Sequence, residues 1–390
     1  MIKNRVVVGL SGGVDSSVAA YLLKEEGYEV IGLFMKNWHD DSVTISKECP
    51  WLDDSNDAML VAQQLNIPFH VIDLSKEYKT RIVDYMIGEY ARGRTPNPDI
   101  VCNREIKFDL FQFIAKKLGA EYLATGHYAR KLETGVEAGK KYHLLAGKDL
   151  NKDQSYFLCQ LNQDQLASAI FPIGELQKSE VRSLAKKAKL STANKKDSQG
   201  LCFIGKVHLP DFLKQRLSAK KGRVIEIPRE APIYKVEDKK NESHSPYSYT
   251  ADMGIEIGQH EGAHFYTIGQ RRGLDIGGFS KPLFVIATDI TNNIIYTGMG
   301  DDHPGLFRSS LFVRASDVHW LVNDIGLQNT KSLKLRARFR YRQPLEPCTI
   351  YKHEEGLIIQ FEQPQRGIAT GQFVVWYDGD ELIGSGVIDL

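Results

Sequence analysis

The sequence predicts an α/β fold in which an N-terminal domain with a parallel sheet is followed by a small β-rich central domain and a C-terminal β-barrel. The first observation is that apolar, strand-like runs alternate with helical patterns up to about residue 145, which is typical of a parallel sheet covered by helices. The second is that short alternating runs, rich in Gly, Pro and Thr, replace helices beyond about residue 205, which is typical of β-barrels. We expect the domains at residues 1–205, 206–303 and 304–390.

The expected elements follow from two periodicities. Apolar runs of a few residues predict strands, and apolar residues that recur three or four positions apart predict helices. In the first domain the predicted strands are 5–11, 29–36, 68–74 and 121–129. The predicted helices are 15–28, 56–67, 77–93, 106–119 and 179–190. Period-two runs predict the later strands at 265–270, 283–290, 293–300, 333–342, 356–363, 372–379 and 381–390. The polar stretch 237–250 reads as a loop or insertion.

Charge and apolar content exclude several classes of protein. The 390 residues include 50 Lys and Arg and 49 Asp and Glu, so any nucleic-acid binding must come from local patches. The sequence has no run of 18 apolar residues and no apolar leader, so we expect no membrane span and a cytoplasmic location. The cysteines are too few and scattered for a disulfide framework; they are Cys49, Cys102, Cys159, Cys202 and Cys348.

The stretch LSGGVDSS, residues 10–17, lies between the first predicted strand and the first helix. It lacks the lysine with which a Walker A loop reaches terminal phosphates. Glycines still allow backbone N–H groups to surround an anion, and the helix N-terminus adds partial positive charge. The stretch therefore predicts a site for the pyrophosphate part of ATP. The alternative is a plain turn in which Asp15 or Ser16 caps the helix.

Ligands of open α/β sheets bind at the C-terminal ends of the strands, which adds Met35 and Gly126 as candidates. A methionine at such a position is more often a core residue. Mg²⁺ is expected with ATP, and Asp15 is the nearest carboxylate. The expected nucleotide site consists of Gly9, Leu10, Ser11, Gly12, Gly13, Val14, Asp15, Ser16, Met35 and Gly126.

Two cysteines lie in polar, cationic surroundings. Cys102 follows a Pro-rich loop just before a predicted helix, where the helix dipole, Arg104 and Lys107 would acidify its thiol. Cys202 follows a polar turn near Lys195 and Lys196. Each cysteine alone would more often be a small core residue, so the prediction of reactive thiols rests on their matching settings.

The stretch KLRARFRYR, residues 334–342, alternates cations with apolar residues. On a strand this pattern predicts one basic face, suited to phosphate binding. The alternative is the solvated outer face of a barrel strand. The cations are Lys334, Arg336, Arg338, Arg340 and Arg342.

Eight stretches, in order and nearly from end to end, resemble the bacterial tRNA-uridine 2-sulfurtransferases, or tRNA-specific 2-thiouridylases, a family of PP-loop ATP pyrophosphatases. The stretches are GLSGGVDSSVAA (9–20), GRTPNPDIVCNREIKF (93–108), ATGHYAR (124–130), KDQSYFL (152–158), KKDSQGLCFIG (195–205), YTIGQRRGL (266–274), RARFRY (336–341) and GQFVVWYDGD (371–380). The segment around 225–255 is longer than we expect of the family, which leaves only the local shape of the central domain open.

The resemblance implies ATP-dependent 2-thiolation of the wobble uridine in tRNA. The C2 oxygen would be adenylated, and sulfur would then displace AMP. Cys202 would carry a persulfide, and Cys102 would either attack it, leaving a Cys102–Cys202 disulfide, or assist direct transfer. Asp99 would act as acid or base unless it merely forms a turn, and Asn97 and Pro98 would shape the pocket for the flipped base.

The resemblance also implies partners and RNA contacts. The expected partners are the tRNAs for Lys, Glu and Gln and a persulfide donor, either a cysteine desulfurase or a sulfur-relay protein. The implied RNA contacts are His127, Lys152, Asp153, Gln154, Arg340, Tyr341 and Gln372, although His127 could equally be a buried histidine at a sheet end. Arg271 and Arg272 are weaker candidates for phosphate binding.

Two rival functions stay open. A PP-loop ligase that adenylates a small molecule before amidation would explain residues 9–17 but neither Cys102 nor Cys202. A non-catalytic tRNA-binding protein would explain the basic stretch but not the intact loop.

Overall fold

The N-terminal domain is built on a five-stranded parallel sheet with strand order β3-β2-β1-β4-β7. The computed structural model describes residues 3–37, 50–136, 139–197, 209–235, 246–322 and 331–389. The strands of this sheet are β1 (Lys3–Gly9), β2 (Tyr28–Lys36), β3 (Phe69–Asp73), β4 (Tyr122–Ala124) and β7 (Ala169–Ile170). The sequence prediction of a parallel sheet is confirmed.

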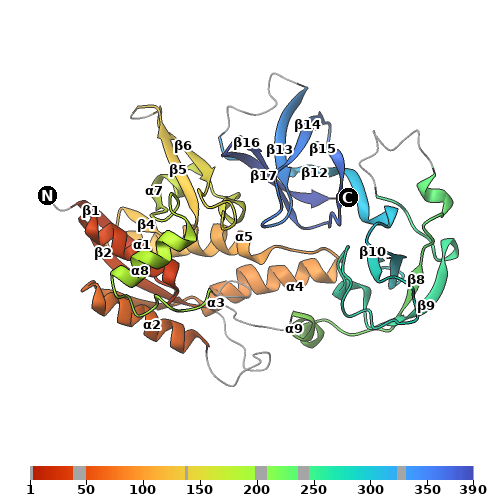
Figure 1. Ribbon diagram of the computed structural model, residues 1–390, viewed down its shortest axis with the longest axis horizontal. Helices are drawn as coiled ribbons and strands as arrows, with labels where there is room; N and C mark the ends of the chain where they lie inside the picture. Colours follow the sequence, from red (N-terminus) through yellow and green to blue (C-terminus); the bar gives the residue numbers. More distant parts are fainter. Residues whose placement is uncertain are drawn as a thin grey trace.

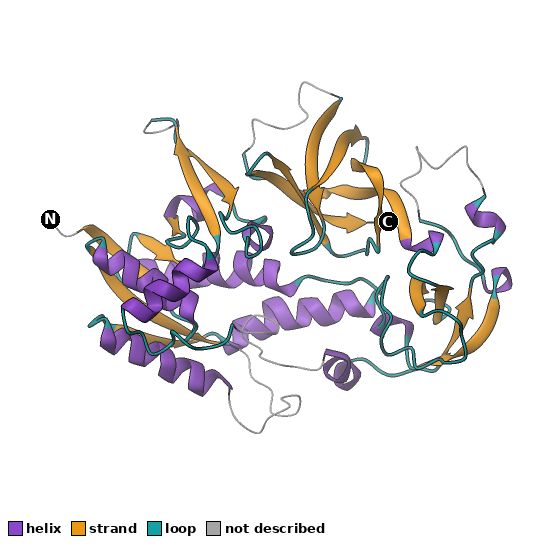
Figure 2. Cartoon of the chain, viewed as in Figure 1, coloured by secondary structure: helices purple, strands orange, loops and turns teal. Residues whose placement is uncertain are grey.

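Helices cover both faces of this sheet (Figures 1 and 2). Val6 and Val8 of β1 pack in one hydrophobic cluster, with α1 (Val14–Glu25), α2 (Pro50–Gln64) and α8 (Lys178–Lys187). Val7 packs in the other cluster, because neighbouring residues of a strand point to opposite faces. The remaining helices are α3 (Ser75–Tyr78), α4 (Asp84–Ala91), α5 (Pro98–Cys102), α6 (Gln112–Lys117), α7 (Gln163–Ser168) and a 3₁₀ turn (Ser155–Leu158), with π-helical stretches at Lys79–Val83 and Asn103–Phe111.

The predicted strand 121–129 is divided between two sheets. β4 ends at Ala124, and β5 (Ala129–Thr134) forms a hairpin with β6 (Lys141–Ala146). The chain leaves the first sheet at Gly126, where a Cβ would lie 2.6 Å from the backbone nitrogen of Ser16. The chain therefore passes close to the start of α1 just after β4 ends.

The central domain is a four-stranded sheet in the order β10-β11-β8-β9, preceded by α9 (Leu209–Arg216). Its strands are β8 (Gly222–Glu226), β9 (Ile255–His260), β10 (Leu283–Asp289) and β11 (Ile294–Met299), with 3₁₀ turns at Pro232–Tyr234, Ala251–Met253, Ala263–Phe265 and Pro304–Leu306. A cluster of tyrosines and aliphatic residues fills its core. The domain lies at the opposite end of the molecule from the N-terminal sheet (Figure 1).

The C-terminal domain is a closed barrel, because β12 pairs with both β15 and β17. Its strands are β12 (Phe307–Trp320), β13 (Ser332–Arg338), β14 (Glu346–His353), β15 (Gly356–Arg366), β16 (Phe373–Asp378) and β17 (Glu381–Asp389). The β5–β6 hairpin of the N-terminal domain continues this sheet, since Leu382 and Glu381 pair with Leu144 and Leu145. One sheet therefore joins the first and last domains.

The basic strand differs from its prediction. β13 ends at Arg338, whose side chain is buried and hydrogen-bonds Asp153. Lys334, Arg336, Arg340 and Arg342 are exposed, but the last two follow the strand rather than extend it. The prediction of five cations on one strand face is therefore wrong. Among the helices of the described ranges, none is long and apolar enough to cross a bilayer.

Candidate nucleotide site and reaction loop

The loop between β1 and α1 is held by its own backbone and hydroxyl groups. Gly12 has φ of +71°, and a Cβ there would lie 2.2 Å from the carbonyl oxygen of Asp54, so only glycine suits this position. Gly13 is the N-cap of α1 and supplies no side-chain cap. Ser16 Oγ accepts from the Ser11 N–H at 3.2 Å and donates to the Gly13 carbonyl at 3.1 Å. Because neither Asp15 nor Ser16 caps α1, the alternative of a side-chain-capped turn is not supported.

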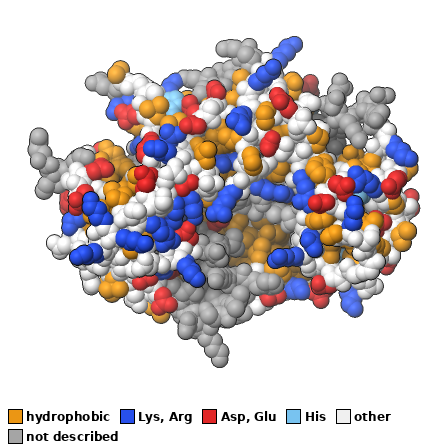
Figure 3. Space-filling model, viewed as in Figure 1, with side chains coloured by type: hydrophobic (Ala, Val, Ile, Leu, Met, Phe, Trp, Pro, Cys, Tyr) orange, Lys and Arg blue, Asp and Glu red, His pale blue; other side chains and the backbone are white. Residues whose placement is uncertain are grey.

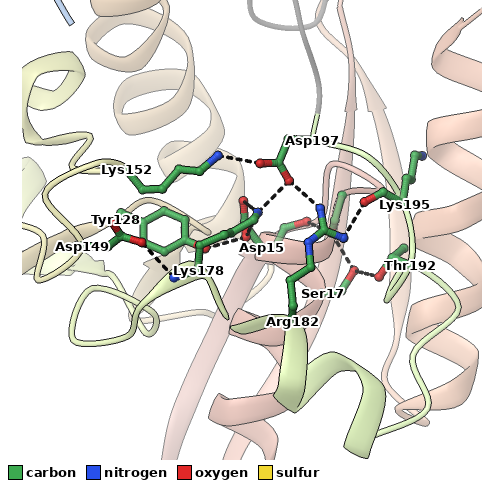
Figure 4. A network of polar contacts seen from close by, with 12 residues as sticks. Asp15, Ser17, Tyr128, Asp149, Lys152, Lys178, Arg182, Thr192, Lys195 and Asp197 are labelled. Carbon is green, nitrogen blue, oxygen red and sulfur yellow. Dashed lines mark hydrogen bonds and ion pairs between the residues drawn. The ribbon is translucent and has the colours of Figure 1, made fainter. Parts of the chain in front are cut away.

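A lysine from another helix contacts the loop. Lys178, the first residue of α8, places its Nζ 2.8 and 2.9 Å from the two carboxylate oxygens of Asp15. The Tyr128 hydroxyl donates to the same carboxylate at 2.8 Å. Burial and the neighbouring Asp15 raise the pKa of Tyr128, so it stays a donor. Figure 4 shows these side chains converging from separate elements.

Asp197 connects this loop to a second group of cations. Its carboxylate lies 2.8 Å from Lys178 Nζ, 2.6 Å from Lys152 Nζ and 2.8 Å from Arg182 Nη2. Burial raises the pKa of Asp197, but the hydrogen bonds from Lys152 and Lys178 outweigh it and lower the pKa to about 2. The carboxylate is therefore charged at neutral pH, and Lys178 bridges two anions (Figure 4).

Arg182 and Lys195 hold the segment that leads to Asp197 against α8 and α2. Arg182 donates to the carbonyls of Ala193 and Lys195 at 3.1 and 2.7 Å. Lys195 pairs with Asp54 of α2 at 2.7 Å and also with Asp57. Lys195 was predicted to lie near the Cys202 thiol. In the structure its ammonium group forms ion pairs with two carboxylates of α2.

The two further nucleotide candidates have packing roles. Met35 is 4% exposed and lies in the core under the sheet. Gly126 approaches the backbone of Asp15 and Ser16 rather than open space. The structure brings Gly126 next to the loop, and contact of either residue with a nucleotide stays a prediction.

The reaction loop, residues 94–97, leads into the helix that carries Cys102. Asn97 Oδ1 accepts from the Ile100 N–H at 3.3 Å and so caps α5, with Pro98 as its first residue. Cys102 is the last residue of α5 and is fully buried in the apolar cluster. It is therefore the fifth residue of a helix rather than the residue before one, and the predicted position at a helix start is wrong. Arg104 contacts Glu105 and Gln160. Cys202 lies outside the described residues.

Similarity to known proteins covers the whole chain. Family models described as tRNA methyl transferase HUP domain, tRNA methyl transferase PRC-barrel domain and aminomethyltransferase beta-barrel domain match residues 4–206, 240–299 and 311–388. The proteins named tRNA-specific 2-thiouridylase MnmA from Christiangramia forsetii and Flavobacterium johnsoniae are each 59% identical, over 98% of this chain and 99% of the relative. The chain belongs to the tRNA-specific 2-thiouridylase family. The predicted family and fold class are thereby confirmed.

A solved 4-thiouridine synthetase–RNA complex with bound ATP is 18% identical and covers 55% of this chain and 50% of that chain. The TM-score of that comparison is 0.32. Within the described ranges, no three His, Cys, Asp or Glu side chains gather as metal ligands.

Two residues that the sequence predicts to contact RNA are buried. His127 Nδ1 and Thr125 Oγ1 share a hydrogen bond of 2.7 Å, and the imidazole ring lies between Phe108 and Phe171. Burial, with a smaller contribution from Lys107, holds the pKa of His127 well below its usual value. It is therefore neutral, as the alternative of a buried sheet-end histidine predicts.

Asp153 is the second buried residue, 4% exposed. Its carboxylate accepts from Arg338 Nη2 at 2.5 Å, from the Gly147 N–H at 2.8 Å and from the Ser155 N–H at 3.0 Å. The same Arg338 nitrogen donates to Tyr377 at 2.8 Å. This buried ion pair ties the barrel to the N-terminal domain, which differs from the expected surface contact.

The remaining expected RNA contacts are distributed over several environments. Lys152 pairs with Asp197, and Gln154 accepts from the Tyr128 N–H at 3.0 Å. Tyr341 packs on Phe157, with ring centroids 4.6 Å apart. Arg340 is exposed and also donates to the Gly367 carbonyl. Gln372 donates to the reaction loop, as described below.

Sequence reasoning missed several side chains that surround the loop between β1 and α1. The cations among them are Lys178 and Arg182, and the others are Tyr128, Thr192 and Asp197. One signal was available, because a phosphate loop without a lysine calls for a cation from elsewhere, and Lys178 directly precedes the predicted helix 179–190. No spacing rule connects positions 15 and 178.

Proposed function

We propose that the protein replaces the C2 oxygen of the wobble uridine in tRNA with sulfur in an ATP-dependent reaction. The observation that carries this proposal is 59% identity, over nearly the whole chain, to proteins named tRNA-specific 2-thiouridylase. Family similarity of this extent favours the same substrate class.

The loop geometry supports the nucleotide step. The uridine C2 oxygen would attack the α-phosphate of ATP, and pyrophosphate would leave into the backbone N–H groups at the start of α1. Lys178, which pairs with Asp15 of the loop, is the cation that would stabilise the negative charge of the leaving pyrophosphate. Its ammonium group would exchange Asp15 for phosphate, and Asp15 would then hold Mg²⁺ together with phosphate oxygens. Mg²⁺ would neutralise charge on the leaving group.

The sulfur step uses two thiols. A persulfide donor would load Cys202 as Cys202–S–SH. The Cys102 thiolate would attack the Cys202 sulfur, forming the Cys102–Cys202 disulfide and releasing HS⁻, which displaces AMP from C2. A cellular dithiol would then reduce the disulfide with two electrons. In the alternative, the persulfide attacks C2 directly with help from Cys102. Asp99 would move the proton, beside a base pocket formed by Asn97 and Pro98.

RNA would bind through exposed cations. Arg340 with Tyr341 on the barrel, and Arg271 with Arg272 on the central domain, are exposed or half-buried. Figure 3 shows Lys and Arg side chains gathered across the middle of one face of the molecule. Phosphate contacts of this kind give affinity rather than base specificity. The tRNAs for Lys, Glu and Gln are the proposed substrates, and for His127 and Asp153 burial favours a structural role.

The test is to incubate the protein with ATP, Mg²⁺, a sulfide source and unmodified tRNA, and to analyse the nucleosides by mass spectrometry. 2-Thiouridine and pyrophosphate are expected together. Ser16→Ala, which removes the hydroxyl that joins Ser11 to Gly13, should abolish pyrophosphate release and keep tRNA binding. Undiminished release in both Asp15→Ala and Ser16→Ala would remove the nucleotide site from this loop.

The rival functions give different outcomes in the same assay. A small-molecule ligase would keep full activity in Cys102→Ala and make no 2-thiouridine. A non-catalytic tRNA-binding protein would bind tRNA without consuming ATP.

A further inference from the structure

The reaction loop is held from the side by the C-terminal barrel. The Thr95 N–H donates to the Thr370 carbonyl at 2.8 Å. Gln372 Nε2 donates to the carbonyls of Thr95 at 2.9 Å and Pro96 at 3.2 Å. Three hydrogen bonds thus join the residues just before Asn97 to a turn almost 280 residues further along the chain.

The barrel side of this contact is built for close approach. Gly371 has φ of +90°, and a Cβ there would lie 3.0 Å from the Thr95 nitrogen and 3.0 Å from Arg94 Cβ. The backbone on either side is tied to β17, because the Gly371 N–H donates to the Ile388 carbonyl and the Ile388 N–H to that of Gln372. The Gln372 side chain therefore projects from a fixed backbone.

The loop and its helix have two further attachments. Thr95 Oγ1 lies 3.1 Å from Thr267 Oγ1 of the central domain. Beyond Cys102, Arg104 donates to Gln160, and Gln160 donates to Ser385 of the barrel at 2.8 Å. The segment with Asn97, Asp99 and Cys102 is thus attached to the barrel both before and after these residues.

We propose that Gln372 is a positioning residue that sets the geometry of the reaction loop, and that it does not contact RNA phosphate. Its partners are carbonyls, which only accept, so the amide must turn Nε2 toward them and uses both N–H groups there. The remaining Oε1 is an acceptor and cannot bind a phosphate oxygen. The barrel is then part of the catalytic geometry as well as a binding module.

Hydrogen exchange tests this attachment without any substrate. Gln372→Met keeps the length of the side chain and removes its donors. In the tRNA-free protein, amide exchange across residues 93–102 should accelerate about fivefold or more, the factor that corresponds to one net hydrogen bond. Arg340→Ala, on the same barrel but without a bond to this loop, should leave that exchange unchanged. Unchanged exchange in Gln372→Met would overturn the proposal.

Kinetics test the consequence, which rests on the proposed function. Gln372→Met should lower kcat for thiolation about tenfold or more, because reacting groups are displaced, while the Kd for tRNA stays within about twofold. A weaker Kd with unchanged kcat would instead make Gln372 an RNA contact. If the wild-type protein forms no 2-thiouridine, the proposed function fails, but the exchange result still decides the attachment.

A milder variant guards against misfolding. Thr267→Val removes only the hydroxyl that faces Thr95 from the central domain. It should accelerate exchange over the same residues by a smaller factor. Gln372→Lys restores donors toward the two carbonyls and should return part of the protection and part of kcat, whereas a phosphate contact would show only tighter tRNA binding.

Discussion

Lys178 Nζ lies 2.8 and 2.9 Å from the two carboxylate oxygens of Asp15, although the residues are 163 positions apart in the chain. The glycine-rich loop, which has no lysine of its own, is therefore contacted by a lysine from α8. The same ammonium group is 2.8 Å from Asp197, the last described residue before the segment that holds Cys202. One lysine thus links the nucleotide loop to the start of that segment.

Lys178→Ala should slow pyrophosphate release about a hundredfold, the order found when one preorganised group that stabilises transition-state charge is removed. tRNA affinity should not change. Lys178→Arg keeps the charge and should retain part of the rate. The matched control is Lys186→Ala, an exposed lysine in the last turn of the same helix. A normal rate of pyrophosphate release by Lys178→Ala, measured at saturating ATP, would show that Lys178 only pairs with Asp15 in the nucleotide-free protein and does not act in the reaction.

Arg340→Ala should weaken the binding of every tRNA by a similar factor and reduce the salt slope of log Kd by about 1, because a phosphate contact carries no base information. Filter binding or fluorescence titration at several salt concentrations measures both quantities. Lys352→Ala, which removes an exposed cation on β14, controls for net charge. An unchanged salt slope in Arg340→Ala would exclude contact between this arginine and the RNA backbone.

Asp153→Ala should lower the free energy of unfolding by about 3–5 kcal/mol, because it leaves the Arg338 guanidinium buried and unpaired. The side chains of Arg338 and Asp153 are 6% and 4% exposed, so solvent cannot compensate. Urea unfolding monitored by tryptophan fluorescence gives the difference. The double variant Asp153→Ala/Arg338→Met should recover much of the loss, since it removes both buried charges. If Asp153→Ala had wild-type stability but bound tRNA more weakly, Asp153 would be an RNA contact, as the sequence resemblance implies, and not a structural residue.

Cys202→Ser should fail to accept persulfide sulfur, and Cys102→Ser should accept it but not complete transfer. During turnover the two thiols should form a reducible disulfide, which requires their Cα atoms to come within roughly 7 Å. Mass spectrometry of protein trapped with a labelled persulfide donor locates the sulfur. Label on another cysteine would overturn these roles.

The other cysteines provide the controls for this experiment. Burial raises the pKa of Cys159 to about 12, and burial also raises the pKa of Cys348 to about 12. Both remain thiols at neutral pH and are poor nucleophiles. Cys159→Ala and Cys348→Ala should therefore keep normal thiolation, as should Cys49→Ala, whose residue lies outside the described ranges.

Those parts of the fold that depend on neighbouring residues in the sequence, such as buried strands and helix ends, could be predicted. The run Val6–Val8 predicts a strand buried on both faces, and the structure places these valines in clusters on opposite sides of the sheet. The helix start at Pro98 was also readable, since an asparagine before a proline is a common N-cap and first position. Counted from Pro98, Cys102 is the fifth residue of the helix and not the residue before it.

The site was less predictable because its residues meet only in three dimensions. Alternation predicted that Arg338 would lie on an exposed face with the other cations of 334–342. Instead its side chain is buried, where it pairs with the carboxylate of Asp153, 185 positions earlier in the chain. Gly126 was predicted from its place after a strand, yet the atom that demands glycine there is the nitrogen of Ser16. Such long-range partners leave no mark in a single sequence.

The pairing of β17 with β6, and of Gln372 with Thr95, has a consequence for synthesis on the ribosome. The reaction loop and the β5–β6 hairpin emerge early, but their partners lie more than 200 residues downstream. Contacts with such separation form late in folding. The loop between β1 and α1 therefore emerges from the ribosome long before the partners that fix residues 94–97 have been made. Under the proposed function, the nucleotide step would become possible before sulfur transfer, and the two steps would be separated in time until the last strand of the barrel has been synthesised.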